Sequence, residues 1–302
     1  MPTVPLLLNT ITIKHCQGLQ QRLQLAHNAG FSGCELWLHE VAPELLSKAD
    51  RREASQRYGI TLETAASIDC SAILQHSKLS VSGLCPPSHA ALQWPVALDT
   101  QTLSALDATL RAAAEINASY VLLPILHPEA TISSIATVVN QLCVLAAPYN
   151  IRLGLEPVGH VGCCNRIVDM LEVLQRIEAD SSVGVIVDAF HFFRAGHDLS
   201  DLTAIRPEQI IAVHINDAID LPHDQLLGHR HRTYPGTGIW DIEGFCRTLF
   251  TRAYQGPIVT EILNDDLWTT DAKQVCDKAY ATSHAVVQRA LDNGVLDNGR
   301  QS

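Results

Sequence analysis

The sequence of 302 residues has little of what marks membrane, secreted or nucleic-acid-binding proteins. No apolar run approaches the ~20 residues of a membrane span. The N-terminal segment has neither the basic region nor the small-residue cleavage site of a signal peptide. The 21 basic residues are scattered along the chain, and the net charge of −11 would repel a phosphate backbone. We therefore expect no membrane partner and no nucleic-acid partner.

Motifs built on cysteine or glycine are missing as well. The nine cysteines are an odd number without CxxC spacing, which favours reduced thiols in the core of a cytoplasmic protein. No GxGxxG follows the first apolar run, and GxxxxGK[ST] does not occur. These absences remove the usual reasons to expect a nucleotide-binding sheet. A hydrophobic content of 47% in a chain of this length leaves ample material for a large core.

What the sequence does contain is a regular alternation of short apolar runs and longer segments with helical periodicity. Eight apolar runs lie at residues 4–9, 33–37, 60–65, 119–126, 151–157, 183–190, 210–217 and 256–263. The predicted helices lie at 18–30, 42–59, 103–117, 131–150, 166–179, 240–254 and 271–291. Because parallel strands need long crossover connections, eight such units predict an α/β fold, a single (β/α)8 TIM barrel domain spanning residues 1–302. An open, doubly wound sheet is the alternative.

Two segments interrupt this rhythm, at residues 66–99 and 218–239. We interpret both as long loops, and long loops in compact domains tend to be functional or disordered. In a TIM barrel both would leave from the C-terminal ends of strands, where active sites are built. We therefore expect both loops at the active-site face.

Four consecutive apolar runs in the second half of the chain deliver an ionisable side chain near their C-terminal end. These residues are Glu156, Asp188, His214 and Glu261, with Asp217 also at the end of the seventh run. In a closed barrel the strand ends share one rim, and carboxylates that close stay ionised only if a cation neutralises them. We therefore predict one divalent metal ion; hard oxygens plus one nitrogen suit Mn²⁺, Mg²⁺ or Co²⁺, with Zn²⁺ or Fe²⁺ as further options. The alternative is that each acid is a helix cap or a surface residue.

Other side chains near these strand ends are candidates for contacts with a substrate. His191 lies three residues beyond the acid of the sixth run, where it could bond a substrate hydroxyl beside a metal. Arg232 precedes a Pro-Gly turn that would return it to the rim. His160 is either a substrate contact or a loop residue. We interpret Glu35 as a structural hydrogen-bonding residue, and Trp37 as core packing or an apolar pocket wall.

Five motifs resemble the xylose isomerase-like superfamily of sugar phosphate isomerases and epimerases. In chain order they are LGLEP (153–157), VDAFH (187–191), VHINDA (213–218), RTYPGTG (232–238) and VTEI (259–262). The resemblance is close over residues 150–265; in the first half it consists of the strand–helix rhythm and GFSGCELW (30–37). It implies a TIM barrel with one catalytic divalent metal, ligated by Glu156, Asp188, His214 and Glu261. It also implies substrate contacts from His191 and Arg232.

Such a site suits reactions that begin by removing a proton next to a carbonyl. A metal would chelate the carbonyl and its neighbouring hydroxyl and stabilise an enediolate, with Glu156 and Glu261 as the catalytic proton-transfer groups. We expect an isomerase or epimerase of a sugar or sugar phosphate, acting on a small carbohydrate-like molecule. The alternative is a dehydratase of a cyclic keto-polyol, of the inosose or 3-dehydroshikimate type. Substrate identity and assembly into a homo-oligomer stay open.

Overall fold

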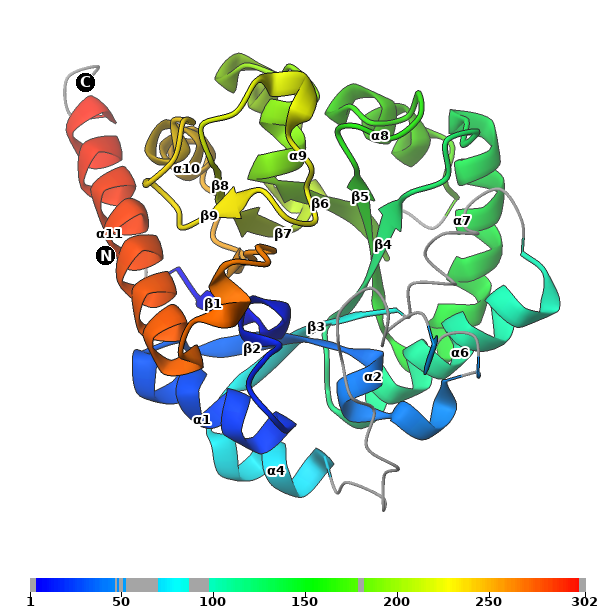
Figure 1. The fold of residues 1–302 in the computed structure, drawn as a ribbon. Coiled ribbons are helices and arrows are strands. Elements are labelled where there is room, and N and C mark those ends of the chain that lie inside the picture. The colour runs from blue at the N-terminus through cyan, green and yellow to red at the C-terminus, as the bar shows by residue number, and fades with distance from the viewer. Residues whose placement is uncertain are drawn as a thin grey trace.

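The structure, a computed structural model, describes residues 4–46, 48, 51–52, 70–86, 98–178 and 182–298. Parallel strands in this part of the chain close into a barrel in the order β1-β10-β7-β6-β5-β4-β3-β2, with helices around it (Figure 1). The strands are β1 (Leu6–Asn9), β2 (Gly33–Trp37), β3 (Ser80–Cys85), β4 (Tyr120–Ile125), β5 (Arg152–Pro157), β6 (Val183–Asp188), β7 (Ile210–Ile215) and β10 (Ile258–Thr260). The predicted (β/α)8 barrel is confirmed, and an open sheet is excluded because β1 pairs with both β2 and β10.

Helices follow most strands and cover the outside of the barrel (Figure 1). They are α1 (Leu19–Ala29), α2 (Leu38–Val41), α4 (Cys70–Ser77), α6 (Thr100–Glu115), α7 (Ile132–Ala146), α8 (Ile167–Gln175), α9 (Ala189–Arg194), α10 (Ile242–Thr251) and α11 (Ala272–Asn298). Short 3-10 helices lie at Thr10–Ile13, Pro43–Leu45, Ala147–Tyr149, Leu199–Ala204, Pro207–Gln209, His223–Gln225 and Leu267–Thr269. Six predicted helices correspond to α1, α6, α7, α8, α10 and α11, whereas the prediction at 42–59 lies largely outside the described residues.

The barrel strands are buried on both faces, which explains why they read as continuous apolar runs. In β1, Leu6 and Leu8 belong to the layer between strands and helices, whereas Leu7 belongs to a separate cluster inside the barrel. Ile186 and Val259 are members of the same inner cluster. These side chains fill the barrel interior, so the polar residues at the strand ends lie over a packed floor.

The third strand does not lie where the sequence predicts it. The expected strand at 60–65 is outside the described residues, and β3 with α4 occupies part of 66–99, so the prediction of one long loop over that range is wrong. The segment of β3, SVSGLC, has few large apolar residues because a neighbouring ring takes the space. A Cβ on Gly83 would lie 2.3 Å from the ring of Tyr120, which is fully buried inside the barrel.

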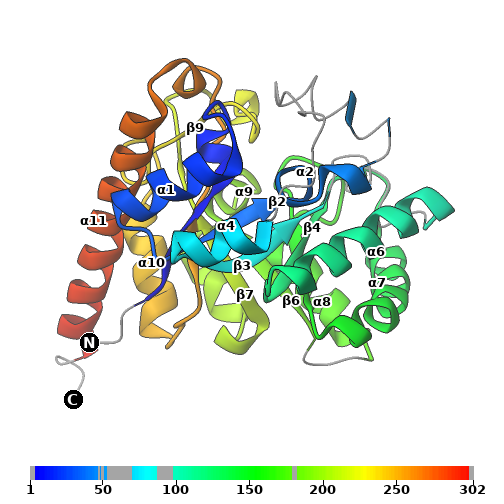
Figure 2. The same ribbon diagram turned by 90° about the horizontal axis from the view of Figure 1, so that it is seen from below.

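The other predicted loop carries a small two-stranded ribbon. β8 (Asp217–Ala218) pairs antiparallel with β9 (Arg232–Thr233). Figure 2 shows β9 and α2 at one end of the barrel and the C-terminal end of α11 toward the other end. The carboxylate of Asp217 accepts the backbone N–H groups of Gly238 at 2.8 Å and Trp240 at 3.1 Å. Asp217 therefore holds the base of this segment in place.

One helix in the described part of the chain passes a simple test for a membrane span. The segment Ile132–Tyr149, α7 and the turn after it, is long and apolar enough by length and composition alone. Ile135, Val139 and Leu142 of this segment are buried in the layer between the helices and the barrel. Its apolar character is therefore accounted for by its position on the barrel.

Candidate metal centre

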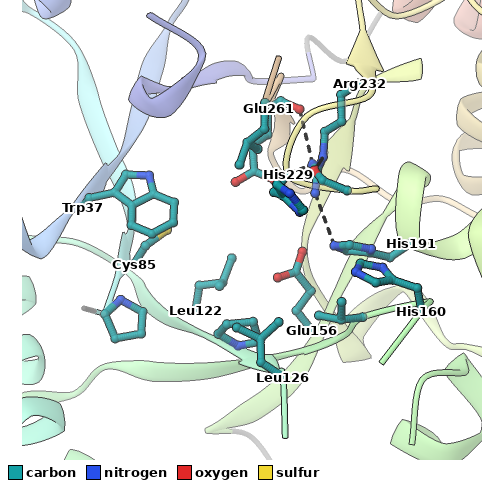
Figure 3. A pocket seen from close by; sticks show the side chains of 15 residues that line it. Trp37, Cys85, Leu122, Leu126, Glu156, His160, His191, His229, Arg232 and Glu261 are labelled. Atoms are coloured by element: carbon teal, nitrogen blue, oxygen red, sulfur yellow. Dashed lines mark hydrogen bonds and ion pairs between the residues drawn. The ribbon is translucent and has the colours of Figure 1, made fainter. Parts of the chain in front are cut away.

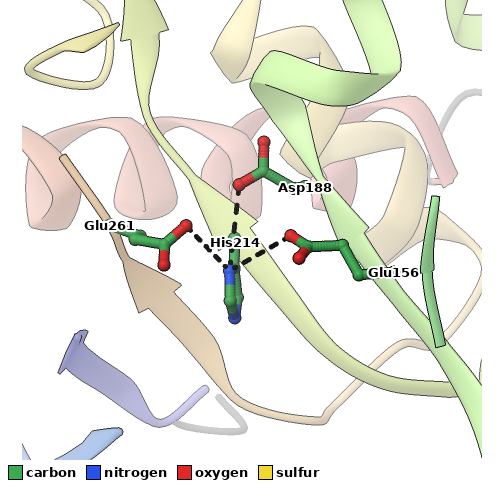
Figure 4. Close-up of side chains that lie close together, drawn as sticks. All are labelled: Glu156, Asp188, His214 and Glu261. Carbon is green, nitrogen blue, oxygen red and sulfur yellow. Dashed lines mark hydrogen bonds and ion pairs between the residues drawn. The ribbon is translucent and has the colours of Figure 1, made fainter. Parts of the chain in front are cut away.

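Four side chains at the C-terminal ends of barrel strands point to a common centre (Figure 4). They are Glu156 of β5, Asp188 of β6, His214 of β7 and Glu261, the first residue after β10. One candidate ligand atom from each lies within 4.8 Å of the others, and all four residues are buried. The structure thus brings together the four residues that the sequence predicts as metal ligands.

His214 presents one ring nitrogen to this centre and the other to a carboxylate inside the barrel. Its Nδ1 lies 3.3 Å from Oε2 of Glu261, 3.8 Å from Oδ2 of Asp188 and 3.9 Å from Oε1 of Glu156. Its Nε2 lies 3.2 Å from Oε1 of Glu35. A carboxylate behind a histidine ligand fixes the orientation and tautomer of the ring. Nδ1 is therefore the nitrogen that faces the metal position.

Glu35 is held in turn by two polar side chains of the barrel interior. The Tyr120 hydroxyl donates to Oε1 at 2.7 Å, and the Asn9 amide donates to Oε2 at 2.5 Å. Asn9 also donates to Oε1 of Glu261 at 3.0 Å and accepts the indole N–H of Trp37 at 2.9 Å. Burial would raise the pKa of Glu35, but the neighbouring imidazole and these hydrogen bonds lower it. The structural role predicted for Glu35 is confirmed, whereas sequence reasoning missed Asn9, the last residue of the first apolar run.

A buried arginine neutralises part of the negative charge. Arg232, which is 3% exposed, places Nη1 2.7 Å from Oδ2 of Asp188 and 2.7 Å from Oε2 of Glu261. Its Nη2 lies 3.2 Å from Nε2 of His191, and its Nε donates to the backbone oxygen of Gly228 at 2.7 Å. Because a guanidinium only donates, Nε2 of His191 is the acceptor and Nδ1 carries the proton. Arg232 and His191, which the sequence predicts as substrate contacts, therefore both lie beside the centre.

Asp188 serves a helix and the centre at the same time. The sixth apolar run extends to residue 190, but β6 ends at Asp188 and α9 begins at once. Oδ1 of Asp188 accepts the backbone N–H of His191 at 3.0 Å, as the N-cap of α9. Oδ2 accepts the side-chain amide of Asn216 at 3.1 Å and also contacts Arg232. The helix-cap interpretation and the metal-ligand interpretation are thus compatible for this residue.

The pKa values of the carboxyl groups reflect burial and the uneven distribution of charge. Burial raises the pKa of Glu156 well above its usual value; His214 and Arg232 oppose this effect, whereas Asp188 and Glu261 add to it. Burial would likewise raise the pKa of Asp188, but Arg232 and two histidines outweigh it and bring the pKa down to about 2. Without a further cation, the centre therefore favours a proton on Glu156.

The histidines divide into one that is charged and two that are neutral. Burial would lower the pKa of His214, but Glu35 and Glu261 outweigh it and raise the pKa well above its usual value. Burial lowers the pKa of His191 to about 3. Burial and nearby arginines lower the pKa of His160 to about 4. Near pH 7 the last two rings are neutral hydrogen-bonding groups.

Several buried polar atoms at the centre have no hydrogen-bond partner within the described residues. They are Oε1 of Glu156, Nδ1 of His191 and Oδ1 of Asn216. A buried carboxylate oxygen without a partner is unfavourable, and a divalent cation would pair it. Three carboxylates and one imidazole nitrogen also form a donor set that suits Mn²⁺, Mg²⁺ or Co²⁺, with Zn²⁺ or Fe²⁺ as further options. The residues present therefore fit a divalent ion.

A cavity of about 120 Å³ opens beside this centre (Figure 3). Its polar lining comprises Glu156, His160, His191, His229, Arg232 and Glu261. The ring centroids of His160 and His191 lie 5.8 Å apart. Trp37 lines the cavity too, so it is a pocket wall. Sequence reasoning missed Gly228 and His229, because nothing in the sequence indicates how their loop folds back over the rim.

Comparison with known proteins places the chain among its relatives. Residues 23–282 match the family described as Xylose isomerase-like TIM barrel. An inosose isomerase of Halalkalibacterium halodurans is 27% identical over 157 residues, which are 52% of this chain and 55% of that protein. A 3-dehydroshikimate dehydratase of Pseudomonas aeruginosa is 30% identical over 127 residues, which are 42% of this chain and 20% of that protein. The chain thus matches about half the length of the first of these relatives.

Solved structures share the fold over nearly the whole chain. A crystal structure of the IOLI protein with a bound zinc atom has a TM-score of 0.78 at 20% identity, covering 95% of this chain and 99% of that chain. The structure of L-ribulose 3-epimerase has a TM-score of 0.70 at 17% identity, covering 99% of this chain and 100% of that chain. The solved structures show the shared fold, and the sequence match over residues 23–282 shows that the protein belongs to the xylose isomerase-like TIM barrel family.

Proposed function

We propose that the protein is a divalent-metal-dependent isomerase or epimerase of a sugar or sugar phosphate, acting by proton transfer next to a carbonyl. The observation that carries this proposal is the buried group of Glu156, Asp188, His214 and Glu261 beside a cavity. Relatives named inosose isomerase and L-ribulose 3-epimerase support the class of reaction. The bound zinc atom in the IOLI protein supports a requirement for metal.

The residues of the centre would divide into those that hold the ion and those that also move protons. Glu156, Asp188, His214 and Glu261 would hold the ion, which when bound supplies a Lewis acid for a carbonyl oxygen. We assign proton transfer to Glu156 and Glu261, because both line the cavity and lie on either side of His214 (Figure 4). A proton removed by one and returned by the other to the opposite face inverts a carbon centre. Return to the adjacent carbon gives isomerisation.

Three further residues would bind the substrate. Arg232, His191 and His160 all line the cavity. The guanidinium of Arg232 donates only, whereas a neutral imidazole both donates and accepts. The lowered pKa values of His191, about 3, and His160, about 4, keep both rings neutral near pH 7. These side chains are therefore suited to hydroxyl and carbonyl oxygens.

Dehydration of a cyclic keto-polyol is the second candidate. The observation in its favour is the 30% identity to 3-dehydroshikimate dehydratase over 127 residues. Both reactions begin by removing a proton next to a carbonyl, and they differ in whether a hydroxyl on the next carbon then leaves. The same carboxylates would serve in either case.

Proton exchange separates the two candidates. The protein, loaded with Mn²⁺, is incubated in D₂O with ketohexoses and with 2-inosose and followed by NMR and ultraviolet absorption. Deuterium at the carbon next to the carbonyl without loss of water supports the isomerase or epimerase, whereas an absorbing unsaturated product supports the dehydratase. Glu156→Gln and Glu261→Gln should abolish turnover, and Glu172→Gln, on the outside of α8, should leave it unchanged. Full activity after removal of all metal by a chelator would refute the proposal.

A further inference from the structure

The cavity has two chemically different sides, contributed by different parts of the barrel. The polar side comes from β5 and the residues after it, the residues after β6 and β10, and the segment from Gly228 into β9; Val158 and Leu263 are the apolar residues of these segments. The apolar side comes from Trp37 at the end of β2 and Cys85 at the end of β3, which lie across the cavity from His160 and His191, and from Leu122 in β4 and Leu126 just after β4, which lie between them (Figure 3). We propose that this apolar side selects an uncharged substrate that bears a hydrocarbon part, such as a deoxy sugar. The inference rests on the proposed function and names its substrate class.

Among the residues that the structure describes, the apolar side offers almost no hydrogen bond to a ligand. The indole N–H is the polar group of the Trp37 side chain, and it already donates to Asn9 at 2.9 Å. The indole ring therefore presents its carbon atoms to the cavity. The thiol of Cys85 is buried, and burial raises its pKa well above the usual value, so it is neutral. A hydroxyl pressed against this wall would lose its water without gaining a partner, whereas a CH₂ or CH₃ group gains from burial.

The charges around the cavity argue against a phosphorylated substrate. Arg232 is the one residue with a permanent positive charge among the lining residues that the structure describes. Its Nη1 is already shared between Asp188 and Glu261, 2.7 Å from an oxygen of each. Asp188, Glu261, Glu35 and Glu156 give the centre four carboxyl groups, which one guanidinium, the imidazole of His214 and the proposed divalent ion would at most balance. A phosphate dianion would therefore enter a site in which the described residues offer no surplus of positive charge.

The orientation of the substrate follows from the two sides. Its carbonyl and neighbouring hydroxyl belong at Glu156 and Glu261, next to the ring of His191. The rest of the molecule then lies against the apolar side, along Leu126 and Leu122 toward Trp37, where a terminal CH₃ suits the wall better than a CH₂OH.

Binding of matched sugars tests this inference. Isothermal titration of the Mn²⁺-loaded protein compares 6-deoxy-D-fructose, D-fructose and D-fructose 6-phosphate, and then the three corresponding L-sugars. We expect the deoxy sugar of the better series to bind about five- to ten-fold more tightly than its parent. The phosphate should bind at least about ten-fold more weakly than the parent. Absence of a deoxy preference in both series, or equal or tighter binding of the phosphate, overturns the inference.

A substitution in the wall links the preference to the residues named. Leu126 is half-buried, and Leu126→Gln offers a hydroxyl a partner, so the deoxy preference should fall to within about two-fold. Val144→Gln is the matched control, because Val144 is 77% exposed on α7, and it should keep the full preference. An unchanged preference in Leu126→Gln contradicts the inference.

The same samples in D₂O distinguish this inference from the proposed function. A binding preference for the deoxy sugar without proton exchange refutes the proposed function and leaves the inference standing. Proton exchange in a protein that binds the phosphate most tightly supports the proposed function and refutes the inference.

Discussion

The carboxylate of Glu35 should set the metal affinity of the centre, although Glu35 is not one of the four predicted ligands. It lies 3.2 Å from Nε2 of His214 and is fully buried. In Glu35→Gln the side chain keeps its shape but loses its charge, so it supports the imidazole less well. Such partners of a ligating histidine typically contribute 10- to 100-fold to metal affinity, or about 1.4–2.7 kcal/mol. We expect a loss of that size in the affinity for Mn²⁺.

The affinity is measured by titrating Mn²⁺ into the metal-free protein and following the free ion by electron paramagnetic resonance. Tyr120→Phe removes only the hydrogen bond of 2.7 Å to Glu35, so it should lower the affinity for Mn²⁺ by a smaller factor than Glu35→Gln. Glu172→Gln, outside the barrel, controls for the general loss of one negative charge. If Glu35→Gln binds Mn²⁺ as tightly as the wild type, the reasoning about His214 is wrong.

Three further predictions concern the stability of the metal-free protein, measured by urea denaturation. Gly83→Ala should destabilise it by about 1–3 kcal/mol, because the added Cβ would lie 2.3 Å from the Tyr120 ring; a smaller effect would show that the ring moves freely. Arg232→Met should destabilise it by about 3–5 kcal/mol by removing the guanidinium partner of two buried carboxylates, and Mn²⁺ should restore part of the loss. Burial lowers the pKa of His191 from 6.5 to about 3, so the stability that this residue contributes above pH 6.5 is lost as the pH falls toward 3. From pH 7.5 to pH 5 the loss should be about 2 kcal/mol, and His191→Asn should lack it.

The strand ends that form the centre are predictable from the sequence because the architecture constrains them. Parallel barrel strands carry their C-terminal ends to one rim, so acids that end β5 and β6 must lie near the histidine of β7. Glu156, Asp188 and His214 are therefore found by counting apolar runs and reading the next polar residue. The same rule applied to the first run would have found Asn9, whose amide is less conspicuous than a charge.

Features that depend on packing between distant segments were not predictable. β3 is not recognisable as an apolar run because it carries glycine at position 83, where the Tyr120 ring occupies the space of a side chain. The sequence shows the glycine but not the ring that requires it. The contact of Arg232 with Gly228 depends on the path of the segment between β8 and β9. Whether Trp37 faces a cavity or the core depends on its hydrogen bond to Asn9, which joins residues 28 positions apart.

The bond between Asn9 and Glu261 joins side chains that are 252 positions apart and closes the seam between β1 and β10. Glu261, the last predicted ligand along the chain, therefore reaches its place only when β1 and β10 have paired. A nascent chain still lacking β10 would have three of the four groups and no closed ring. A divalent ion held by these four groups would consequently bind late in folding, and its binding energy would stabilise the closed barrel over partly folded states.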